Sequence, residues 1–231
     1  MHISVFSIVL IFCSIPSIAQ ISNFNDDRGI PLTTKQYKDI QGSPYLESGD
    51  WMIGSLTDSD NKVIENIQLR FNAFDNELEV FKNGTAIVVY KNDIVSFDLL
   101  MIDSDGKSRK MLFKTGYELG NDVEKDDYVR IIYEGKHHSL IQLFSKDKIK
   151  VTPAAYGEAE YERFVDTSEY YLIAGNDYEE IKLNKRNFLK VFSNEKDAIK
   201  DYLSERSVDF NNPEDMKNLM IFIDELYLKG S

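Results

Sequence analysis

The stretch ELEVFKNGTAIVVY, residues 77–90, decides the fold class of this chain. It contains two runs rich in β-branched and aromatic residues, with Asn83-Gly84 between them. Asn-Gly is the strongest short signal for a two-residue hairpin turn, because both of its positions must adopt a positive φ. The stretch therefore predicts two antiparallel strands joined by a tight turn.

The same pattern of short strands and tight turns extends in both directions from this hairpin. Upstream, WMIGSL at 51–56 and VIENIQLRFN at 63–72 are separated by a polar turn. Downstream, similar pairs of runs flank the turns at 103–106, 135–136 and 175–177. Strands joined by short turns are antiparallel neighbours, so we expect about nine to eleven strands in a curved meander, an open barrel or a two-layer sheet.

After the last strand-like run, the spacing of apolar residues changes to the period of amphipathic helices. Asn184, Asn194 and Asn212 are each suited to cap a helix, and a proline follows the last of them at the first helical position. The sequence therefore predicts an antiparallel β domain over 42–183 and two or three C-terminal helices over 184–231, packed on the sheet. This order of elements indicates the α+β class.

Residues 1–19 have the features of a signal peptide. An apolar run at 3–15 is followed by Ser17-Ile18-Ala19, whose small residues suit cleavage before Gln20. The run is too short to stay as a transmembrane helix, so we expect no transmembrane segment in the mature chain. We expect export to the periplasm, the cell surface or the cell exterior. Residues 20–41 are polar and form an N-terminal lead-in.

Composition limits the compartment and the partners. The only cysteine, Cys13, lies inside the signal segment, so the mature chain has no disulfide and no thiol chemistry. The formal net charge is −12 and the pI is near 4.8. Such a balance repels nucleic acids and anionic lipid surfaces, and we therefore exclude nucleic acid as a partner.

The sequence contains no strong catalytic or metal-binding motif, so we predict no catalytic residue, no metal and no cofactor. His137 and His138 are adjacent in a hairpin, where neighbouring side chains point to opposite faces and cannot easily share one ion. We therefore interpret them as polar residues near an exposed turn. Asp103 and Asp105 resemble the start of a calcium loop, but lysines stand where its later ligands belong. The tyrosines at 156–178 fit either an aromatic binding surface or packing between sheet and helices.

Two phrases in the chain are similar to those of a known group. GSPYL at 42–46, followed by Trp51, and RFNAFDNELE at 70–79 resemble an uncharacterised group of secreted Bacteroidota proteins with a GSPYL opening and an RYNxYNDEIE-like strand phrase. The resemblance implies export and a β-rich body with a helical end, and it implies no activity. It also singles out four candidate ligand-binding residues: Tyr45, Trp51, Arg70 and Asn72. A hydrogen-bonding role that fixes the sheet explains Arg70 and Asn72 equally well.

These observations favour an exported, non-enzymatic binding or envelope-assembly module whose partner is an unknown envelope protein. Whether the chain is an enzyme stays open. One alternative is a carrier that holds a small apolar ligand in a curved sheet under a helical lid. A second alternative is a hydrolase acting on polysaccharide or peptide, which would require convergent carboxylates in a cleft.

Overall fold

The fold is seen in a computed structural model that describes residues 28–32, 37, 39–47, 49–102, 106–153 and 159–229. The expected signal peptide and residues 103–105 of the predicted turn at 103–106 lie outside the described residues. Within the described ranges, no helix is long and apolar enough to cross a membrane.

The described part of the chain forms fourteen strands followed by three α-helices, which confirms the α+β prediction. Eleven strands form one open sheet in the order β1-β6-β5-β4-β3-β7-β8-β9-β10-β13-β14, and β11-β12-β2 form a small second sheet. The strands are β1 (Gly29–Pro31), β2 (Ile40–Gln41), β3 (Met52–Asp58), β4 (Val63–Asn72), β5 (Glu77–Lys82), β6 (Thr85–Val89), β7 (Ile94–Ile102), β8 (Ser108–Lys114), β9 (Val129–Glu134), β10 (His138–Leu143), β11 (Lys146–Val151), β12 (Tyr161–Asp166), β13 (Glu169–Ala174) and β14 (Asp177–Glu180).

Local turn chemistry explains most of this meander. Asn83 and Gly84 both have positive φ, +52° and +81°, and they join β5 to β6 as the sequence predicts. Four of the fourteen strands were not expected. Strands β1 and β2 lie in the polar segment 20–41, and each is two or three residues long and pairs with a strand far away in the sequence, so no local pattern marks it. Strands β11 and β12 have the sequences KDKIKV and YERFVD, which contain many charged residues.

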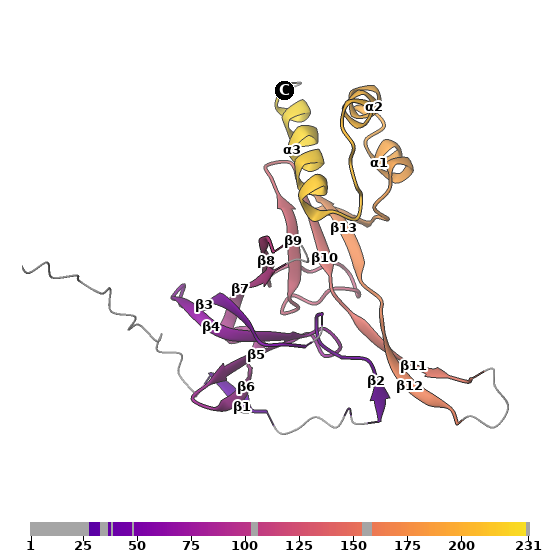
Figure 1. The fold of residues 1–231 in the computed structure, drawn as a ribbon. Coiled ribbons are helices and arrows are strands. Elements are labelled where there is room, and N and C mark those ends of the chain that lie inside the picture. Colours follow the sequence, from indigo (N-terminus) through magenta and orange to yellow (C-terminus); the bar gives the residue numbers. More distant parts are fainter. Residues whose placement is uncertain are drawn as a thin grey trace, which may run out of the picture.

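The large sheet changes direction between β8 and β9. Figure 1 shows β3, β4 and β5 running across the view, whereas β9, β10 and β13 run steeply up to the helices. Strands β8 and β9 pair at only two positions, Phe113 with Arg130 and Lys114 with Val129, and beyond them the strands separate. The sheet contributes to three hydrophobic clusters of described residues: one under β3–β8, one between β9, β10, β13 and the helices, and a smaller one of Leu119, Val123, Val129, Ile141 and Tyr171.

A two-stranded arm continues from the second half of the sheet. The strands β10 and β13 lead directly into β11 and β12, and Figure 1 shows this ribbon extending away from the helices to the small sheet. The break between the two ribbons is at Ser145, whose hydroxyl and carbonyl oxygens both make hydrogen bonds with Thr167.

Three helices cover one end of the sheet: α1 (Lys185–Val191), α2 (Lys196–Glu205) and α3 (Pro213–Lys229). The Asn184 and Asn212 side chains accept hydrogen bonds from the first turns of α1 and α3, as predicted. The predicted cap at Asn194 is wrong, because α2 begins one residue later and Glu195 occupies its N-cap position without a side-chain bond. Met216, Leu219, Met220 and Ile223 of α3 are at most 1% exposed, which confirms the predicted apolar stripe.

Candidate functional site

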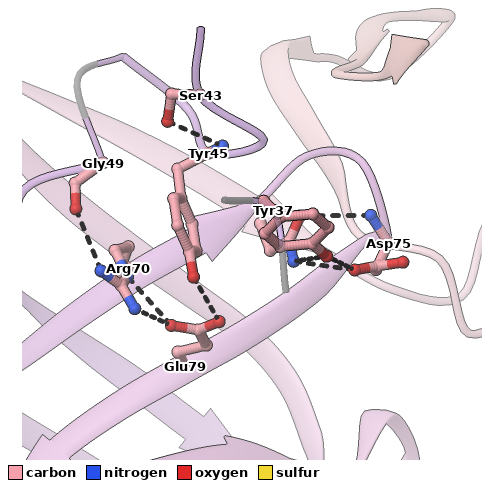
Figure 2. Close-up of polar contacts among 8 residues, drawn as sticks. Tyr37, Ser43, Tyr45, Gly49, Arg70, Asp75 and Glu79 are labelled. Carbon is pink, nitrogen blue, oxygen red and sulfur yellow. Dashed lines mark hydrogen bonds and ion pairs between the residues drawn. The ribbon is translucent and has the colours of Figure 1, made fainter. Parts of the chain in front are cut away.

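Three of the four candidate residues, Tyr45, Trp51 and Arg70, lie together beside strands β4 and β5. Arg70 on β4 donates to one carboxylate oxygen of Glu79 on β5 through Nε (2.9 Å) and Nη2 (2.5 Å), and Tyr45 Oη donates to the other oxygen at 3.2 Å (Figure 2). The Arg70 guanidinium lies 3.9 Å from the ring centre of Tyr45 and 4.3 Å from that of Trp51. The Glu79 side chain is fully buried.

This arrangement leaves Arg70 with little capacity for an external ligand. Its third contact is from Nη1 to the carbonyl oxygen of Gly49, at 3.3 Å, and the two rings cover its faces. A guanidinium presents five N–H donors, and the pair with Glu79 neutralises its charge. The geometry therefore gives Tyr45, Trp51 and Arg70 a role in fixing the strand pair and the loop before β3.

Asn72 lies on the same strand but belongs to a separate network. Its Oδ1 accepts from the backbone N–H groups of Phe74 and Asp75, at 3.1 and 3.2 Å. Its Nδ2 donates to Asp75 Oδ2 at 2.9 Å and to Tyr37 Oη at 3.4 Å. The side chain is fully buried, so Asn72 closes the turn between β4 and β5 and has no surface to offer a ligand.

A different region has the features of a binding site: the cleft where β8 and β9 separate. Its volume is about 1000 Å³, and the first turns of α3 form its third wall. Five cationic side chains and two carboxylates are among its described lining residues, in a chain with a net charge of −12. The cations are Lys107, Arg109, Lys110, Arg130 and Lys217, and the carboxylates are Glu134 and Glu214.

Two of these lining charges are engaged with neighbours outside the cleft. Glu134 accepts hydrogen bonds from Lys114 Nζ at 2.5 Å and from Tyr117 Oη at 2.8 Å. The bond from Lys114 has the larger effect, and together the two bonds lower the pKa of Glu134 although partial burial opposes this. Lys110 pairs with Asp98 at 3.1 Å. Cationic side chains therefore outnumber carboxylates in the described lining of the cleft.

Arg130 is a cleft cation whose hydrogen bond and ring contact are both with neutral groups. Its Nη1 donates to the amide oxygen of Gln142 at 3.2 Å, and its guanidinium lies 5.8 Å from the ring centre of Phe144. It forms no ion pair with any carboxylate in the described ranges. Burial and the nearby charge of Arg109 lower its pKa, although Tyr170, Glu214 and Glu47 oppose this effect. A half-buried guanidinium held only by a neutral amide retains donors for an anion.

The two adjacent histidines occupy a third polar region, under α3. The histidines do adjoin the exposed turn residue Lys136, but His138 is only 7% exposed and the Nε2 atom of His137 is buried without a hydrogen-bond partner among the described residues. His138 Nδ1 lies 2.6 Å from Asp224 Oδ1. The other oxygen, Asp224 Oδ2, accepts from Tyr133 Oη at 3.0 Å and from the backbone N–H of His137 at 3.2 Å.

This network holds Asp224 as a carboxylate. Burial opposes its ionisation, but the hydrogen bonds from His138, the His137 backbone and Tyr133 outweigh that effect and lower its pKa. Because a carboxylate only accepts, Nδ1 of His138 carries a proton. Gly135 is required here, since a Cβ atom would overlap Asp224 Oδ2 and Tyr133 Oη. Asp224 thus fastens α3 to the β9–β10 hairpin.

His138 also lines a pocket of about 320 Å³ between β13, β14 and α1, together with Phe192, Tyr178 and Tyr227. No serine, threonine or cysteine is among its described lining residues. The described residues contain no group of three or more His, Cys, Asp or Glu side chains placed to hold a metal ion. The pocket therefore has an oriented imidazole but no side-chain nucleophile of these types beside it.

Sequence reasoning missed both the cleft and the Asp224 network, although each had a signal. Asp224 lies four residues after Met220, so a charged side chain falls on the apolar stripe of the last helix. The run Lys107-Ser108-Arg109-Lys110 is unusually basic for so acidic a chain. Only the fold brings this run next to Arg130 and the start of α3.

Comparison with known protein families, curated proteins and solved structures finds no match for this chain. The function must therefore be argued from the chemistry of the cleft and its neighbours.

Proposed function

We propose that this protein is an exported, non-enzymatic binding module that holds an anionic partner in the cleft between β8, β9 and α3. The observation that carries the proposal is Arg130, a half-buried guanidinium without a carboxylate partner among the described residues, in a cleft of about 1000 Å³. Four further cations line the same cleft.

Physical chemistry supports an anion at this position. Hydrogen bonds between a guanidinium and a carboxylate or phosphate are charge-assisted, and they are stronger than the bond that Arg130 makes to the neutral Gln142 amide. The chain has a net charge of −12, but salt screens the repulsion between its other charges and an anion beyond about 8–10 Å. A local positive patch can therefore attract an anion at close range. Charge complementarity of this kind selects partners by sign.

Export rests on the sequence alone, through the apolar run and small residues of 1–19 and the absence of cysteine after Cys13. A periplasmic or cell-surface location would place the cleft among envelope proteins and their extracellular partners. The chain would then act in binding or assembly in the envelope.

The two alternatives have less support. A carrier requires space between sheet and helices, but Leu140, Phe188 and Ile223 pack there directly and are all fully buried. A hydrolase could use the imidazole oriented by Asp224, but the lining of its pocket offers no hydroxyl or thiol nucleophile of serine, threonine or cysteine. We therefore retain binding as the proposed function.

The proposal is tested by mapping polyanion binding with amide NMR spectra. Short oligoglutamate, oligogalacturonate and polyphosphate would each be titrated into the protein, with oligolysine as the opposite-charge control. We expect at least one polyanion to shift amides of 108–112 and 130–134, with weaker binding at higher salt. Arg130→Gln should weaken this binding, whereas Arg163→Gln, an equal charge change on the small sheet, should not. Shifts located elsewhere, or none at all, would overturn the proposal.

A further inference from the structure

Building on the proposed function, we infer that the anionic partner is an extended acidic segment of another protein, which binds as an added strand along the edge of β9. Proteins commonly bind extended peptides at an exposed sheet edge, where main-chain hydrogen bonds supply affinity and the flanking side chains supply specificity. The cleft combines such an edge with a basic lining.

The edge is produced by the divergence of β8 and β9. On one side, β9 pairs with β10 along most of its length, from Arg130 with Gln142 to Glu134 with Ser139. On the other side, it pairs with β8 only through Val129 and Arg130. Residues 131–134 therefore lie in the middle of an eleven-stranded sheet, yet no strand of the described ranges pairs with them on the cleft side.

The backbone N–H and C=O groups along this edge are positioned to pair with an added strand. Alternate residues of a strand direct their N–H and C=O groups to each side, and an edge left open is a template for another chain. Proteins usually protect such edges with a covering element or by making them very short. Here the first turns of α3 form one wall of the cleft, and the edge of β9 forms another.

The positive charges of the cleft favour an added strand that is acidic. Arg130 is at the end of the open edge, and Lys217 lies on α3 at another wall of the cleft. Carboxylates on alternate residues of a strand share one face, so an alternating acidic segment can meet both of these cations at once. A basic segment would be repelled, and an oligosaccharide has no strand-like series of N–H and C=O groups to pair with β9.

The test uses a fluorescein-labelled octapeptide of alternating Glu and Thr, titrated with the full chain produced in an exporting host and followed by fluorescence anisotropy. Threonine favours strands without adding charge. The first control is the same peptide with every backbone nitrogen methylated, which keeps all carboxylates but removes every N–H donor. The second control is octagalacturonate, a polyanion without peptide groups, used as a competitor.

We expect the Glu-Thr peptide to bind and the methylated peptide to bind at least about tenfold more weakly, because the lost hydrogen bonds lie along the β9 edge. Arg130→Gln and, as a second variant on an exposed position, Lys217→Glu should each weaken binding. Arg163→Gln should leave it unchanged. On binding, backbone amides at alternate positions within 131–134 should become protected from hydrogen exchange, because alternate residues direct their N–H groups to the cleft side.

Two other results would overturn the inference in different ways. If the methylated peptide or octagalacturonate binds as tightly as the Glu-Thr peptide and still depends on Arg130, anion binding stands and strand addition is wrong. If neither peptide nor octagalacturonate binds, strand addition is wrong; if polyphosphate also fails to bind, the proposed function fails with it.

Discussion

Replacement of Arg70 by methionine should destabilise the protein strongly, because it leaves a buried carboxylate without its cation. The Glu79 side chain is 0% exposed and accepts two of its three side-chain hydrogen bonds from Arg70. The remaining bond, from Tyr45 at 3.2 Å, is long for an O–H donor. Breaking a buried ion pair from one side costs about 3–5 kcal/mol of unfolding free energy.

The double replacement Arg70→Met with Glu79→Leu separates this penalty from the value of the pair itself. When both charges are removed, no uncompensated ion stays in the core, and such exchanges are often neutral. We therefore expect the double variant to regain most of the loss, with a coupling free energy of about 2–3 kcal/mol between the two positions.

Urea unfolding provides the measurement, followed by far-UV circular dichroism because Trp51 lies next to Arg70 and its fluorescence will change directly. Lys150→Met is the matched control, since it breaks an ion pair with Glu160 whose side chains are 68% and 46% exposed. That change should cost less than about 1 kcal/mol. A loss below about 1 kcal/mol for Arg70→Met would refute the role given to this pair.

Three further predictions concern the helical end of the molecule. The pKa of Asp224 is lowered by folding, so its contribution to stability is present above its unfolded pKa of about 3.9 and is lost as the pH falls through the folded value. The stability advantage of the native chain over Asp224→Asn should therefore shrink as the pH falls below about 4 in urea titrations, and a constant difference would contradict this. Gly135→Ala should cost about 1–3 kcal/mol by overlap with Asp224, against about 1 kcal/mol for Gly175→Ala, which has open space but a positive φ. Leu219→Ala should cost about 2–5 kcal/mol and shift circular dichroism and Trp51 fluorescence together; a shift in circular dichroism alone would show that the helices unfold separately.

The elements that were predicted correctly are those specified by neighbouring residues. The Asn83-Gly84 turn, the cap at Asn212 and the apolar stripe of α3 each depend on contacts within a few positions of the chain. Two of the missed strands, β1 and β2, depend on distant partners. Strand β2 is two residues long and exists only because it pairs with β12, more than a hundred positions later.

The candidate site divides in the same way. The resemblance selected Tyr45, Trp51 and Arg70, which do meet in space, but their chemistry depends on the buried Glu79 that completes the cluster. His138 was interpreted as a polar residue near an exposed turn, because adjacent side chains in a hairpin point to opposite faces. Its burial results from Asp224, a residue 86 positions away that α3 carries to it.

The sequence by itself determined the order of strands and helices, the tight turns between them and the acidic balance of the chain, because these follow from local backbone preferences and composition. Only the tertiary structure decided where the charges meet. The divergence of β8 from β9 gathers five cations into one cleft and leaves part of β9 as an open edge. Pairing, burial and cleft formation are properties of residues far apart in the chain, and no local pattern contains them.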